Sequence, residues 1–332
     1  MKLVGIVAAA LVLALAGCPN EARNNSIRAA NEGNTALGQK RYDEAVVQLK
    51  KATDLWSGNH TAWYSLGGAY DGKGDFANAV DATSHAVQLV PEQPMYQLHH
   101  GVYLFEKAVQ AAREDQARRE NKKPAEVDPD LSSVNFEKAL QHLQEAVKLN
   151  DELWRAHYFI GKIYSLTGKS KEAAEELTKA LKSAPPEPAP WVLLSELYLL
   201  WDYTDQAIQV AEAGTTAVPG IADQTNIWYE VGMGYDEKRL DDKAIEAFTK
   251  ALESKRDNHK AKFQRGQAYF RKGDYSNAKR DLLDFSKTAG MSVEFAKQQA
   301  QKMLIDIAAK TAPPGGPERV SPEDLVRKPK GK

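Results

Sequence analysis

The sequence predicts an all-α protein, an α-solenoid of about seven helical hairpins that ends in a C-terminal capping helix. Small residues recur at three fixed places along a period of about 34 residues. Prolines such as Pro91 and Pro185 stand between periods, where a helix must stop. Turn-forming pairs such as Gly74-Asp75 fall inside the period and separate its two helices.

The small residues define the register of the hairpins. The first place is small in every repeat and holds Gly33, Gly67, Gly101, Gly161, Ser195, Gly232 and Gly266. The second is always alanine, at Ala45, Ala79, Ala139, Ala173, Ala207, Ala244 and Ala278. The third holds Ala52, Ala86, Ala146, Ala180, Gly214, Ala251 and Phe285. Because helices approach closely only where side chains are small, these are the expected contacts within and between hairpins.

Larger residues recur around these contacts. One repeat shows the whole pattern in Trp63, Leu66, Gly67, Tyr70, Ala79, Ala86 and Pro91. This pattern resembles the tetratricopeptide repeat, and the resemblance extends from residue 26 to about residue 310. It implies a stack of hairpins that binds other proteins, and it does not specify one partner.

The repeat register also predicts the domain boundaries. Repeats are expected near 26–59, 60–93, 94–153, 154–187, 188–224, 225–258 and 259–290. A capping helix at 292–310 follows, with Ser292 as its N-cap and an apolar stripe of Phe295, Met303, Leu304 and Ile307. The remaining residues, 311–332, are rich in proline, glycine and charge, which predicts a disordered tail.

The third repeat contains an insertion at about residues 106–131, which adds 26 residues between Gly101 and Ala139. Residues 106–113 continue the first helix of the repeat, and a loop follows. Loop closure costs only about 0.6 kcal/mol per doubling of length, so a seven-repeat stack could tolerate it. Long loops are also often functional, so a partner-contacting arm remains an alternative.

The N-terminus reads as a lipoprotein signal peptide over residues 1–17. Lys2 precedes an unbroken apolar run of 14 residues, which is shorter than the roughly 20 residues of a membrane span. The run ends in Leu15-Ala16-Gly17-Cys18, which resembles the bacterial lipobox, and Cys18 is the only cysteine. The resemblance implies that Cys18 is lipidated. A plain secretory signal with an incidental cysteine is the alternative.

Lipidation predicts where the protein resides. Lipidated bacterial proteins of this kind carry three acyl chains, including palmitate, which gives stable membrane anchoring. By family analogy, an aspartate after the cysteine favours the inner membrane, and Pro19 in its place favours the outer membrane, facing the periplasm. Residues 18–25 are expected to form a tether that reaches about 25 Å if extended. The partner is therefore expected to be membrane-near or periplasmic.

Composition and motifs argue against several other functions. The net charge of −1 gives no general case for nucleic-acid binding. Residues 67–74 approach a phosphate-binding loop but end in Gly74, where serine or threonine would bind magnesium. The seven histidines include no ligand pair one helical turn apart. We therefore expect no enzyme activity, no catalytic residues, no metal and no cofactor.

The resemblance implies a binding groove as well. In tetratricopeptide proteins the first helix of each hairpin lines a groove, and recurring positions on it contact ligands. Carried over to this chain, the groove residues are Tyr64, Leu98, Phe105, Arg155, Tyr158, Lys162, Tyr229, Lys260, Phe263, Phe270 and Arg271. Aromatic side chains and arginine often anchor interfaces. The alternative is that these rings pack against neighbouring helices.

The sequence thus predicts a membrane-anchored, protein-binding scaffold that assists assembly or localisation of an envelope complex such as a pilus, secretin or secretion machine. The lipoprotein pilotins of type IV pilus secretins look similar in plan, with a lipid anchor followed by these repeats. An adaptor for peptidoglycan enzymes is one alternative. A carrier of a small ligand or lipid is another.

Overall fold

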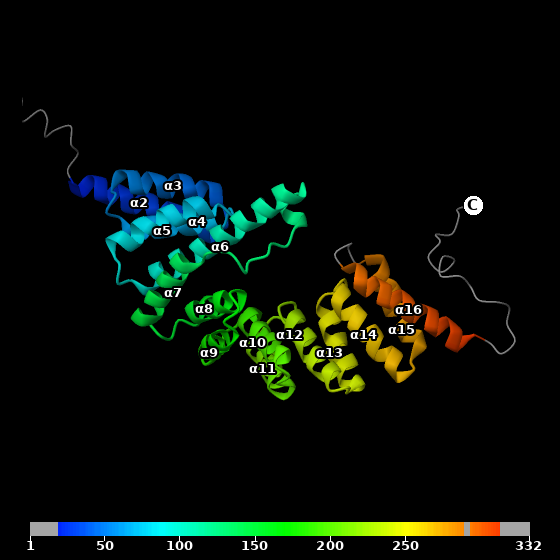
Figure 1. Cartoon of the computed structure of the whole chain (residues 1–332). Helices are drawn as coiled ribbons and strands as arrows, with labels where there is room; N and C mark the ends of the chain where they lie inside the picture. Colours follow the sequence, from blue (N-terminus) through cyan, green and yellow to red (C-terminus); the bar gives the residue numbers. More distant parts are fainter. Residues whose placement is uncertain (1–18, 289–292, 313–332) are drawn as a thin grey trace, which may run out of the picture. The chain divides into compact units, whose positions relative to one another are not determined.

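The computed structural model describes residues 19–288 and 293–312 of the chain (Figure 1). The α-helices are α2 (Pro19–Gly38), α3 (Tyr42–Leu55), α4 (His60–Asp71), α5 (Phe76–Leu89), α6 (Pro94–Glu120), α7 (Glu137–Leu149), α8 (Trp154–Leu166), α9 (Ser170–Leu181), α10 (Pro188–Leu200), α11 (Thr204–Ala217), α12 (Thr225–Glu237), α13 (Asp241–Ser254), α14 (His259–Lys272), α15 (Tyr275–Thr288) and α16 (Glu294–Thr311). No strand occurs among these residues, so the predicted all-α solenoid is confirmed. None of the described helices combines the length and apolar character needed to cross a membrane.

The helices pair as hairpins inside two compact units, one ending at Ala180 and the other beginning at Leu181. In the N-terminal unit α2 packs on α3, α4 on α5 and α6 on α7, and α8 contacts α9. In the C-terminal unit α10 packs on α11, α12 on α13 and α14 on α15, and α16 packs on α15. Six helices begin at the residues where repeats were expected to begin, namely His60, Pro94, Trp154, Pro188, Thr225 and His259.

The small residues lie where the helices of a hairpin meet. A Cβ atom added to Gly161 would lie 2.9 Å from Cγ of Leu177 and 3.1 Å from the backbone oxygen of Ala173. Ala173 and Leu177 themselves have no exposed surface. Interiors are packed too densely to admit extra atoms without displacement, so the glycine sets the distance between α8 and α9.

A left-handed residue ends the first helix of most hairpins. Gly74, Gly168 and Gly273 have φ values of 69°, 76° and 79°. In three other repeats the residue with the left-handed backbone conformation is not glycine but Lys40, Asp202 or Arg239. Glycine adopts this conformation without the steric cost that other residues bear, so the turn is better matched to its sequence in the glycine-containing repeats.

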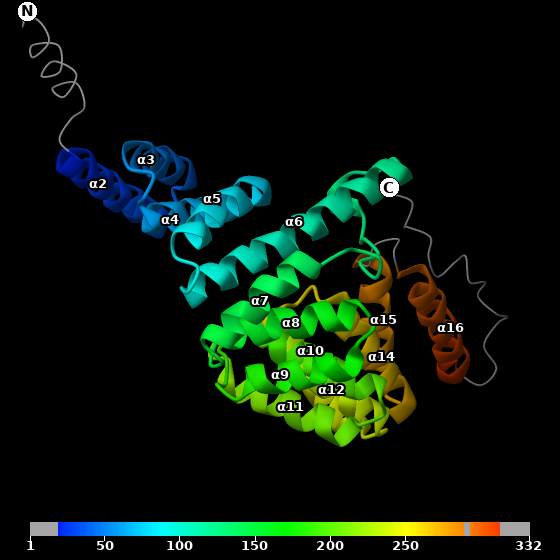
Figure 2. The same cartoon turned by 60° about the vertical axis from the view of Figure 1, so that its left-hand side comes forward.

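The insertion lengthens α6. In the third repeat the left-handed residue is Asn121, with φ of 52°, and the helix continues from Pro94 to Glu120. The predicted continuation over residues 106–113 is therefore observed and extends further. A short 3-10 helix, η1 (Pro124–Glu126), and a loop return the chain to α7. The backbone N–H of Asp130 donates to Oε1 of Gln116 at 3.2 Å, which holds the loop against the helix (Figure 2).

The two ends differ from the expectations. The tether expected at residues 18–25 is helical from Pro19 onward, because α2 begins there. At about 1.5 Å per residue, seven helical residues span about 10 Å, well below the extended reach of about 25 Å. Phe295, expected in the packed stripe of the capping helix, is 74% exposed, whereas Ile307 is 2% exposed. Cys18, Ser292 and residues 313–332 lie outside the described part of the chain.

We predict that Gly161→Leu destabilises the N-terminal unit. The new side chain would collide with Leu177 and with the backbone of Ala173. Overpacking of this kind costs about 3 kcal/mol, which corresponds to a fall in Tm of about 6–12 °C for a unit of this size. Circular dichroism melting measures the change. Gly38→Ala is the matched control, because nothing lies within 4 Å of the added Cβ and its Tm should equal or exceed that of the parent. A Gly161→Leu variant that melts like the parent would contradict the packing argument.

Candidate functional site

The first helices of the N-terminal hairpins carry an aromatic cluster. Tyr64 on α4 stacks near two residues of α6, with ring centroids 4.7 Å from Tyr96 and 5.3 Å from His99. The Tyr64 hydroxyl and Nδ1 of His99 are 2.5 Å apart, within hydrogen-bond distance. His99 also stacks on Tyr103 at 6.0 Å. The cluster therefore joins two consecutive repeats through rings that combine apolar faces with polar tips.

Burial keeps this cluster uncharged. Burial raises the pKa of Tyr64 to about 12, and the neighbouring Tyr96 raises it further. Burial also lowers the pKa of His99 to about 4, and the positive charge of Arg155 on α8 adds to the effect. At neutral pH the site therefore presents neutral hydrogen-bonding groups beside the exposed Arg155. Such a mixture suits a peptide or protein surface better than a small charged ligand.

A second group forms around Lys162 on α8. Its Nζ atom lies 4.9 Å from the ring centroid of Phe105, 5.6 Å from Phe159 and 5.9 Å from Tyr158. Burial lowers the pKa of Lys162, and the nearby Glu106 carboxylate on α6 opposes that shift. Ammonium groups over aromatic faces are attracted by the ring quadrupole. The ammonium group of Lys162 therefore interacts mainly with aromatic rings of the same protein.

Three predicted groove residues are core residues instead. Leu98 and Phe105 are each 1% exposed and pack in the cluster beneath α6, α7 and α8. Phe263 is 8% exposed, and its ring lies 4.8 Å from that of Phe285. Neighbouring helices cover these side chains, so the structure corrects their prediction as partner contacts.

Two more predicted residues of the C-terminal unit hold helices together. Arg271 on α14 donates to Asp236 of α12 and, from Nε at 2.8 Å, to Asp241 of α13. These partners raise the pKa of the guanidinium group, although burial acts in the opposite direction. Phe270 packs edge-on against Tyr275 of α15 at 5.9 Å. Both residues are therefore engaged within the fold.

The last two predicted groove residues, Tyr229 on α12 and Lys260 on α14, are not buried in the core. Burial raises the pKa of Tyr229 to about 12, and its hydroxyl is hydrogen-bonded to Gln264 of α14. Lys260 is exposed. Glu230, the next residue along α12, is only 5% exposed, and burial raises the pKa of its carboxyl to about 8. The sequence-based prediction missed Glu230, Tyr96, His99 and Tyr103, because they flank the helical positions transferred from the resemblance.

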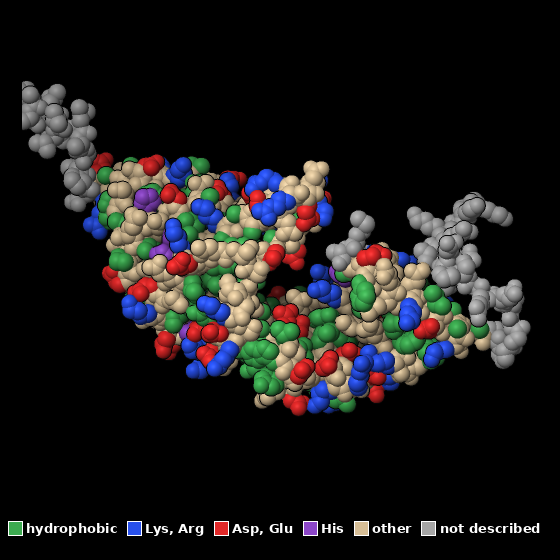
Figure 3. Space-filling model, in the orientation of Figure 1, with side chains coloured by type: hydrophobic (Ala, Val, Ile, Leu, Met, Phe, Trp, Pro, Cys, Tyr) green, Lys and Arg blue, Asp and Glu red, His purple; other side chains and the backbone are tan. Residues whose placement is uncertain are grey.

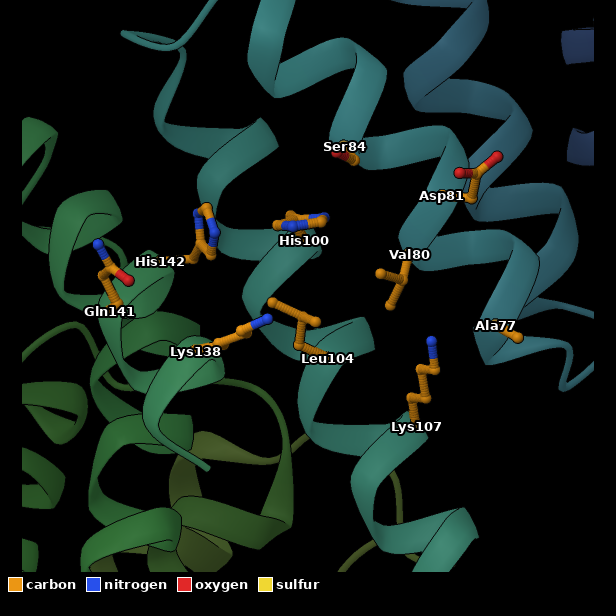
Figure 4. Close-up of a pocket in the computed structure, with 10 residues that line it drawn as sticks. All are labelled: Ala77, Val80, Asp81, Ser84, His100, Leu104, Lys107, Lys138, Gln141 and His142. Carbon is orange, nitrogen blue, oxygen red and sulfur yellow. The ribbon is translucent and has the colours of Figure 1, made fainter. Parts of the chain in front are cut away.

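A polar cavity of about 560 Å³ lies between α5, α6 and α7. Figure 4 shows His100 and His142 side by side in it, with Lys107 and Lys138 nearby. The two imidazole rings are edge-to-face at 4.5 Å. That arrangement packs the edge of one ring against the face of the other and does not direct both ring edges toward one shared ion. Among the described residues, no group of three or more histidine, cysteine, aspartate or glutamate side chains could hold a metal ion.

His100 is hydrogen-bonded to a buried threonine. The Thr83 hydroxyl lies 2.8 Å from the backbone oxygen of Ala79 and 2.9 Å from Nδ1 of His100. Burial lowers its pKa to about 4, and the nearby His142 lowers it further. This histidine is a neutral structural residue at physiological pH.

Comparison with known proteins identifies the repeats. Profiles of the tetratricopeptide repeat match residues 31–94, 131–188 and 242–284, and a second such profile matches 225–258. Together they cover more than half of the chain. The protein belongs to the tetratricopeptide repeat family. No curated protein matches its sequence.

Solved structures share the fold of this tetratricopeptide protein. The APC/C hetero-tetramer Cut9–Hcn1 matches with a TM-score of 0.57 and 13% identity, over 81% of this chain and 48% of that chain. PilF from Pseudomonas aeruginosa matches with a TM-score of 0.51 and 17% identity, over 71% of this chain and 92% of that chain. The chain thus spans about half the length of the first structure. At these identities the likeness concerns the fold alone. Tetratricopeptide repeats serve as protein-interaction scaffolds.

We predict that mild acid destabilises the N-terminal unit through His100. The pKa of about 4 lies below the ordinary value of 6.5, so the unfolded chain binds more protons between these pH values. Stability attributable to His100 is complete above about pH 6.5 and falls as the pH approaches 4, at about 1.4 kcal/mol per unit and up to about 3 kcal/mol.

The variant His100→Asn keeps a hydrogen-bonding group for Thr83 and does not titrate. Its urea unfolding midpoint should therefore fall less between pH 7 and pH 5 than that of the parent. His85→Gln is the control, because His85 is exposed on α5. Identical acid sensitivity in His100→Asn and the parent would refute this assignment.

Proposed function

We propose that this protein is a lipid-anchored scaffold of the bacterial envelope, without catalytic activity, which binds protein partners and assists assembly or localisation of an envelope complex such as a pilus, secretin or secretion machine. The observation that carries the proposal is the aromatic and charged surface formed by the first helices of the tetratricopeptide hairpins. The rings of Tyr64 and His99 are half-buried and stack on each other, next to the exposed Arg155, and Tyr96 packs beneath them at 5% exposed. Side chains of this type anchor protein interfaces.

The mixed charges on the protein surface favour specific binding over non-specific electrostatic attraction. Figure 3 shows lysine, arginine and acidic side chains interspersed on the visible face of each unit. The net charge of the chain is −1. Broad attraction to nucleic acid or to an anionic membrane would require an excess of positive charge. Recognition is therefore expected to depend on local side-chain contacts.

The proposed anchor rests on the lipobox-like sequence that ends at Cys18. One acyl chain alone binds membranes only marginally, and several chains anchor a protein stably. Proline rather than aspartate after Cys18 supports the outer membrane as the destination, with the helical repeats in the periplasm. Because α2 begins at Pro19, a short anchor would hold the first hairpin near the membrane surface.

Loss of the first-helix contacts should remove partners without unfolding the protein. Tyr158→Ala combined with Tyr229→Ala removes one half-buried ring from each unit. After crosslinking in native envelopes, this variant should recover fewer partner proteins than the parent. Val47→Ala on α3 is the control, since Val47 is 64% exposed on a second helix and should leave recovery unchanged. If the double variant melts like the parent and captures the same proteins, the groove is not the binding surface.

Cys18→Ala should release the protein from membranes. Without the thiol no acyl chain can be attached, so the variant should move to the soluble fraction and incorporate no radiolabelled palmitate. The parent should incorporate the label and sediment with outer-membrane vesicles. Palmitate labelling that survives the substitution, or equal sedimentation of both proteins, would contradict the anchor.

A further inference from the structure

The cavity of about 560 Å³ between α5, α6 and α7 lies wholly within the N-terminal unit. Both α5 and α7 pack on α6, and Figure 4 shows the lining residues of α6 between those of the other two helices. On α6 these residues are His100, Leu104 and Lys107, which follow one another by about one turn and so share one face. The cavity therefore results from the packing of three helices and does not depend on a loop.

The cavity is open to solvent. Two of its lining residues, Lys107 on α6 and Lys138 on α7, are exposed, whereas His100 is only 7% exposed. Figure 4 shows the side chain of Lys138 extending toward Leu104 and the side chain of Lys107 extending toward Val80. A side chain of another molecule can therefore reach the polar groups of the lining without displacing a helix.

The lining of the cavity has a net positive charge. Its charged residues are Lys107, Lys138 and Asp81, the last of which lies on α5. Burial lowers the pKa of His142, and it lowers the pKa of His100 to about 4, so both imidazoles are neutral at pH 7. Two lysines and one aspartate leave one positive charge in excess. In the described part of the chain, none of these three charged groups forms a hydrogen bond or an ion pair, so an anion would displace no existing partner.

Hydrogen bonds hold His142 in one orientation at the cavity. The side-chain amide of Gln97 donates from Nε2 to the backbone oxygen of Pro91 at 2.7 Å, which leaves its Oε1 for His142. Nδ1 of His142 lies 2.7 Å from this Oε1. Because an amide oxygen can only accept, Nδ1 carries the proton of the neutral ring and Nε2 is unprotonated. Negative charge nearby raises the pKa of an imidazole, so His142 should take up a proton more readily when an anion enters the cavity.

A carboxylate on an aliphatic stem matches this lining better than a phosphate group does. One carboxylate balances the single excess charge, whereas a doubly charged phosphate would leave negative charge uncompensated near Asp81. Val80 and Leu104 also line the cavity and are half-buried. They offer van der Waals contact to the methylene groups of a glutamate side chain.

We infer that this cavity binds a glutamate side chain of the protein partner, with Lys107 and Lys138 pairing with its carboxylate. The inference rests on the proposed protein-binding function, and it adds a contact surface apart from the aromatic rings of the first helices. Ammonium groups form charge-assisted hydrogen bonds with carboxylates. Lys107 lies at the start of the insertion at about residues 106–131, so the insertion supplies one of the two ammonium groups.

The test uses N-acetyl-glutamate amide as the probe and its uncharged analogue N-acetyl-glutamine amide as the comparison, with the full chain and NMR titration at pH 7. The glutamate compound should bind saturably, shift the imidazole signals of His100 and His142, and move the titration midpoint of His142 to higher pH. Lys107→Gln combined with Lys138→Gln should weaken its binding about tenfold, at about threefold for each exposed ion pair. Asp81→Asn should strengthen its binding about threefold, because a repelling charge is removed.

Lys148→Gln is the matched control, because Lys148 is exposed on the same helix as Lys138 but does not line the cavity. Its substitution should leave binding unchanged. All the substituted side chains are exposed, so the melting curves of the variants should match that of the parent. After crosslinking in native envelopes, the variant that lacks both cavity lysines should recover less partner protein than the parent, and Lys148→Gln should recover as much.

Equal binding of the glutamate and glutamine compounds to the parent would overturn this inference. So would undiminished binding or undiminished partner recovery after both cavity lysines are replaced. Tighter binding of inorganic phosphate than of the glutamate compound would overturn the assignment to a carboxylate. None of these results would affect the proposed scaffold function, which depends on partners being captured at all. If instead no partner is captured by the parent while the glutamate compound binds through both lysines, the scaffold proposal fails and the carboxylate site stands.

Discussion

Close approach of two helices at glycine and alanine is the constraint on which the rest of this structure depends. In the hairpin of α8 and α9, the backbone of Ala173 lies so near Gly161 that one added carbon would contact it at 3.1 Å. Gly101 and Ala139 repeat the arrangement in α6 and α7, also at 3.1 Å. Helix spacing depends on the side chains at the crossing point, and small residues allow the shortest spacing. This contact fixes which side of each first helix is covered by its own hairpin.

The contact also determines which side chains remain for recognition. Once the small residues face the second helix, the rings of Tyr64, Tyr96 and His99 fall between consecutive first helices. These rings connect repeats, and Tyr64 and His99 remain half-buried there. Stacking and partner recognition are therefore not separate properties of this surface. A substitution in these rings changes repeat stacking as well as partner recognition. Its effect on stability must therefore be measured together with its effect on binding.

Buried polar groups give the two units different chemistry on a common framework. The N-terminal unit holds neutral histidines and tyrosines whose hydrogen bonds lie mostly within the chain, as Thr83 and His100 illustrate. The C-terminal unit buries a carboxyl, Glu230, without such a partner. Burial favours the neutral form of this acid and raises its pKa to about 8. The repeat pattern is the same in both units, so the difference comes from residues between the repeated positions.

The sequence by itself determined the helical hairpins, their register and the places where α4, α6, α8, α10, α12 and α14 begin, because small residues and prolines act locally and recur in every repeat. It also indicated the lengthened first helix of the third repeat. Only the tertiary structure decided which side chains neighbouring helices cover and which remain accessible. Leu98 and His99 are adjacent in sequence, and on a helix they point about 100° apart. Neighbouring helices then cover Leu98 completely and leave His99 to meet Tyr64. Likewise, no pattern within α12 reveals that Glu230 is only 5% exposed.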